Sequence, residues 1–217
     1  MTPARKKLLS LYLVRHGQTA WSLSGQHTGR TDIPLTALGE DEARALITWL
    51  GHVRFGLVLT SPRQRARRTC ELVGLGRDAK IEPDLAEWDY GDYEGKLSSE
   101  IRKERPDWDV FRDGCPHGET PVDVSDRADR LIARLSTMDG KFALFSHGQF
   151  GPALAVRWIG LQMAEGRHLS LGTGSLNILS YNPAHPQVRV IALWNATPEL
   201  FQAVSKSAAE RPSYSDL

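Results

Sequence analysis

Three short apolar runs in this chain end in the same way, and this repetition constrains the fold more than any other feature. The runs span residues 8–14, 57–60 and 141–145, and they lead into Arg15-His16-Gly17, Ser61-Pro62-Arg63 and Ser146-His147-Gly148. Runs of this length, bounded by charged residues or glycine, are typical of buried central strands. Because the carboxyl ends of parallel strands share one edge of a sheet, where ligands bind, the three endings are expected to line one pocket.

Helix signals separate these strands. Thr36 is a suitable N-cap for a helix over residues 37–50, and Ser61 followed by Pro62 predicts a helix that has Arg63 in its first turn. The remaining expected elements are an edge strand at 81–85, helices at 98–105, 120–138 and 153–159, and a hairpin of 175–181 with 188–194. Strands that alternate with helices predict a three-layer α/β/α sandwich with a mainly parallel central sheet.

A single domain is expected over residues 1–217. The chain is long enough for one hydrophobic core, and no Gly/Ser-rich or Pro-rich stretch divides it. We expect the core at about residues 8–196, cap or lid loops at about 86–119, and a polar tail at 198–217. Residues 20–34 and 107–119 lack sustained periodicity, so both are predicted to be irregular chain beside the pocket.

Charge and cysteine content exclude several classes of function. A formal net charge of +1 gives no global field that would attract nucleic acid or an anionic membrane, and no apolar stretch approaches the roughly 20 residues that span a bilayer. Cys70 and Cys115 lack the spacing of a disulfide framework or a zinc site, so reduced thiols and a cytoplasmic location are expected. The basic residues before the first apolar run imitate a secretory signal, but this run leads directly into Arg15 rather than a cleavage site.

The predicted pocket has the chemistry of an oxyanion site. Two arginines, Arg15 and Arg63, would meet two histidines there, and the planar guanidinium group binds phosphoryl oxygens bidentately. The amino ends of the helices after residues 61 and 146 are expected to add backbone donors. Either imidazole, His16 or His147, is eligible as a nucleophile, and their spacing in the sequence does not decide between them.

Each of these residues also has an ordinary structural interpretation. A lone Arg-His-Gly is weak evidence, and Glu87 by itself would be a surface carboxylate. We interpret Arg65, Arg67 and Arg68 as a solvated helical face. Only the joint occurrence at three strand ends favours a catalytic pocket. The histidines at positions 27, 117 and 185 lack metal-ligand spacing, so no metal site is expected.

Four separated motifs carry a family resemblance. They are Leu-Val-Arg-His-Gly-Gln-Thr at 13–19, Ser-Pro-Arg at 61–63, Glu87 ahead of Tyr-Gly-Asp-Tyr-Glu-Gly at 90–95, and Ser-His-Gly at 146–148. In this order they resemble the histidine phosphatase superfamily, in its phosphoglycerate mutase-like branch, from about residue 11 to 194. The resemblance implies that His16 is the phosphorylated nucleophile and Glu87 the proton donor. It further implies that Arg15, Arg63 and His147 hold the phosphoryl group, with no metal or organic cofactor.

Further motifs are similar to those of sedoheptulose bisphosphatase-type sugar phosphatases. They lie at residues 21–22, 24–29, 87–95 and 114–120, with His27 and His117 as departures from the usual pattern. The implied substrates are sugar phosphates or bisphosphates. The residues expected to bind them are Arg15, Gln18, Ser22, Thr28, Gly29, Arg63, Glu87, Tyr90, His147 and Gly148.

Two alternatives remain at this point. A phosphoglycerate mutase-type enzyme would carry a longer insertion after the acid with extra basic residues, for which the chain offers only Arg102, Lys103, Arg105 and Arg112. A non-catalytic module would bind a phosphorylated ligand in the same pocket but would lack a catalytic group, and none is missing. We therefore favour hydrolysis of a small phosphorylated molecule. No nucleic acid or membrane is expected as a partner, and a homodimer is allowed.

Overall fold

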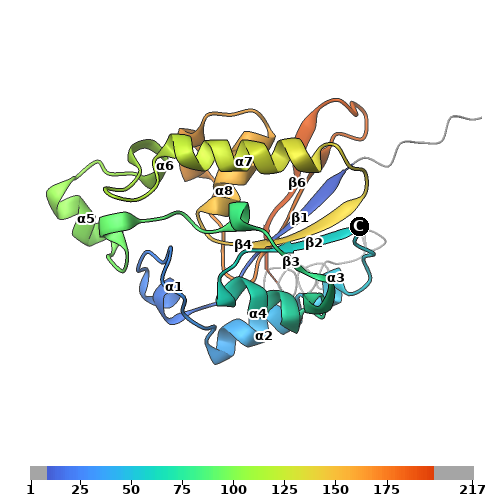
Figure 1. Cartoon of the computed structure of the whole chain (residues 1–217), viewed down its shortest axis with the longest axis horizontal. Helices are drawn as coiled ribbons and strands as arrows, with labels where there is room; N and C mark the ends of the chain where they lie inside the picture. Colours follow the sequence, from blue (N-terminus) through green and yellow to red (C-terminus); the bar gives the residue numbers. More distant parts are fainter. Residues whose placement is uncertain (1–8, 198–217) are drawn as a thin grey trace, which may run out of the picture.

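A six-stranded mixed sheet runs through the middle of the molecule, with helices on both faces (Figure 1). The computed structural model describes residues 9–197, so the predicted tail at 198–217 lies outside the described residues. The strands are β1 (Ser10–Arg15), β2 (Leu57–Thr60), β3 (Lys80–Ile81), β4 (Lys141–Ser146), β5 (Leu176–Tyr181) and β6 (Arg189–Ala196). Their order is β3-β2-β4-β1-β5-β6, which confirms the predicted α/β sandwich.

The register of the central strands brings the three predicted endings to one edge. β4 is parallel to both β1 and β2, with Arg15 opposite Ser146 and Thr60 opposite Phe145. The segments that follow these strands therefore leave the sheet at the same level. β5 and β6 form the predicted antiparallel hairpin, and β5 is antiparallel to β1.

Side-chain alternation in β4 explains the two layers of helices. Phe142 and Leu144 join the core cluster beneath α7 (Pro121–Leu135) and α8 (Phe150–Trp158), whereas Ala143 and Phe145 join the opposite cluster. That cluster includes residues of α3 (Ile47–Leu50) and α4 (Gln64–Leu72), and α2 (Ala37–Ala45) lies beside α4. Both faces of the strand are thus buried, as its continuous apolar run predicts.

Capping residues locate several helices as predicted. Thr36 accepts a hydrogen bond from the Gly39 amide at the start of α2, and Thr120 forms a capping box with Asp123 at the start of α7. The expected helix over residues 37–50 is interrupted at Leu46, and α7 ends at Leu135 rather than near 138. The predicted polar helix is α5 (Ser98–Glu104).

The beginning of α4 differs from the prediction. The helix begins at Gln64, with Arg63 as N-cap residue, and Ser61 does not cap it. The Ser61 hydroxyl instead contacts Nε2 of His147 at 2.6 Å. The cap comes from another segment, because Asp32 Oδ1 accepts a hydrogen bond from the Gln64 amide at 2.8 Å.

Regular structure also occurs where irregular chain was predicted. α1 (Ala20–Ser24) interrupts the expected loop at 20–34, and α6 (Val110–Asp113) lies within the predicted irregular stretch. The expected edge strand at 81–85 is shorter, because β3 ends at Ile81 and a 3₁₀ helix follows. The 3₁₀ helices are η1 (Gly76–Asp78), η2 (Pro83–Leu85), η3 (Gly91–Tyr93) and η4 (Met163–His168).

Residues 86–119, the lid segment, are anchored by aromatic side chains. Trp88, Tyr90, Trp108 and Phe111 are buried and belong to the same core cluster as α7 and α8. Trp88 meets Phe111 edge to face, with ring centroids 5.6 Å apart. Burying one such side chain stabilises a fold by about 1.5–3 kcal/mol. The lid segment is therefore packed onto the core along much of its length.

Candidate active site

The rings of His16 and His147 lie face to edge where β1 and β4 end. Their centroids are 5.2 Å apart and their planes are inclined by 66°. Since Arg15 and Ser146 are register partners, the next residue on each strand projects from the same edge of the sheet. The parallel register thus brings together two histidines that are far apart in sequence.

His16 is held as a neutral imidazole with one nitrogen left for chemistry. Its Nδ1 lies 2.7 Å from the carbonyl oxygen of Gly17, and since a carbonyl only accepts, Nδ1 carries the hydrogen. Nε2 of the neutral ring therefore keeps a lone pair. Burial lowers the pKa of His16 well below its usual value, and the charges of Arg65 and Arg15 lower this pKa further.

His147 has both ring nitrogens engaged by protein groups. Nδ1 accepts a hydrogen bond from Nε of Arg65 at 3.2 Å, so Nε2 carries the hydrogen and donates it to the Ser61 hydroxyl. Burial, together with the charge of Arg65, lowers the pKa of this histidine well below its usual value. Of the two rings, only that of His16 lines the adjoining cavity. The spacing of the two histidines left this choice open and the family resemblance implied His16, and the hydrogen bonds favour the same ring as nucleophile.

Arg65, and not Arg63, contacts the histidine pair, through the hydrogen bond from its Nε to Nδ1 of His147. Its side chain is fully buried, and besides His147 it donates to the carbonyl oxygens of Thr28, Gly29 and Thr31 at 2.9–3.2 Å. The interpretation of Arg65 as part of a solvated helical face is therefore wrong.

The residue at which α4 starts explains why Arg65, and not Arg63, lies on the buried face of the helix. Because the helix begins at Gln64, its inward face carries Arg65, Ala66, Thr69 and Cys70. Small residues at helical spacing from Arg65 are the signal in the sequence that identifies this face. Arg63 stands just before the helix, and its Nε is buried without a hydrogen-bond partner within residues 9–197.

Arg15 lies at the wall of the cavity beside His16. Its Nη1 donates to the carbonyl of Leu171, and its buried Nε has no partner in the described part of the chain. Burial lowers the pKa of Arg15 from its usual value, opposed by the nearby carboxylate of Glu87. A buried guanidinium N–H without a partner is costly unless a ligand accepts it, so this group suits a bound oxyanion.

Glu87 is fixed at the amino end of α8. Its Oε1 accepts from the amides of Trp88 and Phe150, and its Oε2 accepts from the amide of Gln149, all within 2.8–2.9 Å. The sequence analysis expected these helix amides to face the phosphoryl group, and that expectation is wrong because the protein's own carboxylate takes them. Glu87 and His16 line the same cavity.

A model of the histidine phosphatase superfamily, branch 1, matches residues 11–195. The chain belongs to this superfamily. An acid phosphatase of Mycobacterium tuberculosis is 41% identical over 187 residues, covering 84% of this chain and 92% of the relative. The sedoheptulose 1,7-bisphosphatase of Saccharomyces cerevisiae is 40% identical over 182 residues, covering 69% and 67%.

Solved structures agree with this membership. The structure of an open reading frame of M. tuberculosis superposes with a TM-score of 0.82 at 39% identity, and the match covers 87% of this chain and 98% of that one. The mycobacterial glucosyl-3-phosphoglycerate phosphatase gives a TM-score of 0.75 at 26% identity, covering 86% and 98%. The protein is a phosphoric monoester hydrolase of the histidine phosphatase type, and its fold is phosphoglycerate mutase-like.

The cavity of this phosphatase has a volume of about 440 Å³ and contains most of the residues expected to bind substrate. Those that line it with His16 are Arg15, Ser22, Thr28, Glu87, Tyr90 and Gly148. Gln18 does not line it, because its side-chain oxygen accepts from the Thr36 hydroxyl. Gly29 also lies outside, where an added Cβ would be 2.4 Å from the carbonyl oxygen of Trp88.

His27 forms part of the aromatic wall of the phosphatase cavity. It stacks on Tyr90 with centroids 4.5 Å apart and meets Trp108 edge to face at 5.3 Å. Burial lowers the pKa of His27 to about 4, so the ring is neutral near pH 7. His117, the other departure from the family pattern, is exposed and pairs with Asp92.

Two arginines stand at the cavity wall: Arg102, which the sequence analysis named only as a candidate for binding a second phosphate, and Arg167, which it did not name. Arg102 comes from α5 and Arg167 from η4, and both also border a second hollow that adjoins Trp108 and Asp109. Within residues 9–197 neither forms an ion pair with a carboxylate, so their charge is available to a ligand. The same part of the phosphatase contains no metal-binding group of three His, Cys, Asp or Glu side chains and no helix able to span a membrane.

Proposed function

We propose that this phosphatase hydrolyses small phosphorylated sugars, as mono- or bisphosphates, through a phosphohistidine formed on His16. The observation that carries the proposal is the difference between the two rings. His16 faces the cavity with a lone pair on Nε2, whereas His147 uses both nitrogens within the protein. A neutral, oriented imidazole beside buried arginines is suited to attack on phosphorus.

The two half-reactions follow from this arrangement. Nε2 of His16 forms a bond to phosphorus while the bond to the leaving sugar oxygen breaks, and Glu87 supplies the proton for that oxygen. Water then attacks the phosphohistidine, Glu87 takes its proton, and inorganic phosphate and free His16 result. Arg15 and Arg65 offset the charge on the transferring group, with His147 fixing the orientation of Arg65.

Several observations support a sugar phosphate as the substrate. Relatives of 26–40% identity include a sedoheptulose bisphosphatase and a glucosyl-3-phosphoglycerate phosphatase. The cavity volume of about 440 Å³ is in the range of small-molecule sites. Cys70 and Cys115 are free and buried, which supports the proposed cytoplasmic location. The homodimer stays a prediction.

Phosphate release across sugar mono- and bisphosphates, with phosphoglycerates included, tests the function. We expect release from sugar phosphates that persists in excess chelator, together with an alkali-stable label on the protein after incubation with a substrate labelled at phosphorus. Transfer from a bisphosphoglycerate to a phosphoglycerate without net release would favour a mutase. Absence of both release and label across the panel would contradict catalysis and favour a binding module.

The arginines at the cavity wall should determine preference for a second anionic group. Replacing Arg102 or Arg167 with Met is expected to lower kcat/KM for a bisphosphate by about 10- to 100-fold, since hydrogen bonds to charged groups contribute about 1.5–3 kcal/mol. The loss should appear mainly in KM and be much smaller for the monophosphate. Lys103→Met, on the same helix but off the cavity, is the matched control. Equal losses for both substrates would show that these arginines bind no second anion.

A further inference from the structure

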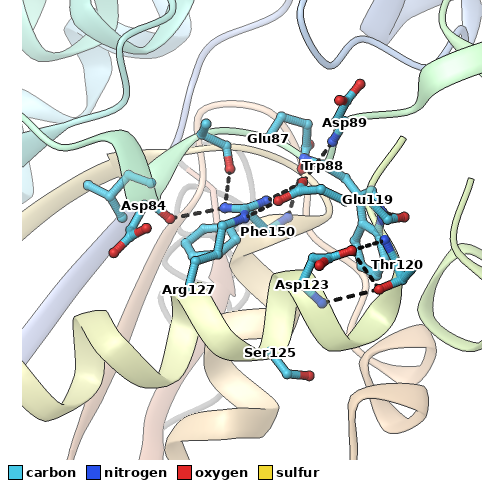
Figure 2. A network of polar contacts seen from close by, with 12 residues as sticks. Asp84, Glu87, Trp88, Asp89, Glu119, Thr120, Asp123, Ser125, Arg127 and Phe150 are labelled. Carbon is cyan, nitrogen blue, oxygen red and sulfur yellow. Dashed lines mark hydrogen bonds and ion pairs between the residues drawn. The ribbon is translucent and has the colours of Figure 1, made fainter. Parts of the chain in front are cut away.

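A buried ion pair lies behind the wall of the cavity. Arg127, two turns into α7, binds the carboxylate of Glu119 with two hydrogen bonds, of 2.7 Å from Nε and 3.0 Å from Nη2 (Figure 2). The Arg127 side chain is only 7% exposed and that of Glu119 is 23% exposed. Neither residue lines the cavity, and the reaction described above uses neither.

Arg127 holds the chain on the amino side of Glu87. Its Nη1 donates to the carbonyl oxygen of Ala86 at 2.8 Å and to that of Asp84 at 3.0 Å. Ala86 directly precedes Glu87. With the two bonds to Glu119, the guanidinium group makes four hydrogen bonds in one plane, which fix its orientation.

Glu119 holds the chain on the carboxyl side of Glu87. Its Oε2 accepts from the amide of Asp89 at 2.9 Å, and its backbone carbonyl accepts from Nε1 of Trp88 at 2.9 Å. Its own amide donates to the carbonyl of Asp89. The residues immediately before and after Glu87 are therefore held by the two members of one ion pair. Figure 2 shows Glu119 and Arg127 beside Glu87, Trp88 and Asp89.

The same guanidinium group also supports the carboxylate of Glu87 from the helix side. It stacks on the ring of Phe150, 4.3 Å from the ring centroid, and the Phe150 amide donates to Oε1 of Glu87 at 2.8 Å. Arg127 therefore contacts the main chain next to Glu87 and, on the other side, the Phe150 residue whose amide binds the Glu87 carboxylate.

We propose that Arg127, acting with Glu119, is a positioning residue that fixes the direction in which Glu87 presents its carboxyl group to the leaving oxygen. The inference rests on the proposed acid role of Glu87 and adds a residue that touches no substrate. Removing the charge of Arg127 from water is costly, and apolar replacements of buried ion pairs are often neutral for stability. The pair is therefore better explained by the orientation that it imposes than by the stability that it adds.

The test compares substrates that differ in leaving group. Acid catalysis matters for a sugar phosphate, whose alkoxide is a poor leaving group, and little for p-nitrophenyl phosphate. Glu87→Gln sets the reference, with a loss of kcat/KM of about 10²–10⁴-fold on the sugar phosphate alone. Arg127→Met should lower the sugar phosphate value by about 10- to 100-fold and the aryl value by less than about threefold. In the double variant with Glu87→Gln, Arg127→Met should cause little further loss of kcat/KM, because both changes disturb the same interaction.

Arg157→Met is the matched control. Arg157 binds Asp129 of α7 with two hydrogen bonds, of 2.7 and 3.0 Å, and lies off the cavity. We expect no change of substrate ratio in this variant. Equal losses of Arg127→Met on both substrates, or full additivity with Glu87→Gln, would overturn the proposal. If Arg127→Met does not fold, Glu119→Gln is subject to the same criteria.

Amide hydrogen exchange separates this inference from the proposed function. The amides of Gln149 and Phe150 donate to Glu87, so they should exchange faster in Arg127→Met and at the wild-type rate in Arg157→Met. This measurement needs no turnover. Unchanged exchange would reject the positioning role even in an active enzyme, whereas a wild-type protein that hydrolyses neither substrate would reject the proposed function instead.

Discussion

Replacing His16 with alanine is expected to abolish turnover and phosphoprotein formation while leaving the fold intact. Of the two histidines only His16 lines the cavity, and within residues 9–197 its one side-chain hydrogen bond goes to the adjacent residue, Gly17. Removing a nucleophile typically costs on the order of 10⁴-fold or more in kcat. The ring is buried and meets His147 edge to face, so its removal should lower the free energy of unfolding by about 0.5–3 kcal/mol without abolishing the fold.

His147→Gln is the informative companion to this variant. Both rings are buried and adjacent, but only His16 is proposed to carry the phosphoryl group. The His147→Gln variant should still acquire an alkali-stable label, at a reduced rate, because Nε2 of His16 remains. Rapid-quench labelling and thermal unfolding of both variants measure the outcome. A label on His16→Ala, or full activity in it, would refute the nucleophile assignment.

Replacing Arg65 with methionine is expected to lower kcat by about 10²–10³-fold, because a fixed positive charge beside both rings is lost. Arg65 contacts His147 directly, and its charge acts on both rings. Arg63→Met should cost at least about tenfold less, because no hydrogen bond or charge effect links Arg63 to either ring within the described residues. Arg63→Met is therefore the matched control for Arg65→Met.

Arg65 also holds three loop carbonyls, so its replacement must be separated from simple unfolding. Circular dichroism and thermal melting of the Met variants, together with Arg65→Lys, provide this check. Lysine keeps the positive charge but lacks the planar N–H donors of the guanidinium group. We therefore expect Arg65→Lys to be little more active than Arg65→Met. If Arg63→Met proved as damaging as Arg65→Met in folded protein, the assignment made from the sequence would be right and the structural one wrong.

The fold was predictable wherever a local pattern is sufficient. β2 has the predicted bounds, since a short apolar run between charged segments defines a buried strand. α7 was found from Thr120 and Asp123, whose capping contacts are local. α1 and α6 were not found, because helices of four or five residues show no periodicity and depend on caps at Thr19 and Asp109.

The site was predictable only as far as strand ends define it. His16, His147 and Arg15 follow from the register of β1 and β4. Arg65 does not, because its inward position depends on carbonyl groups 34–37 residues away in the chain. The place of Glu87 on the α8 amides is likewise a contact across 62–63 positions. Local sequence patterns do not encode such pairings, and Arg167 was missed for the same reason, whereas Arg102 was named only as a basic candidate after the acid.

The ion pair of Arg127 and Glu119 joins the two ends of the lid segment, Ala86 and Glu119. The exposed residues 103–107 between them can change in number at small entropic expense, because doubling a loop adds only about 0.6 kcal/mol to the free energy of closure. Such changes leave the anchorage of Glu87 where it is. New specificity can therefore be engineered into this exposed part of the lid segment without rebuilding the proton transfer, provided that the buried aromatic anchors are kept.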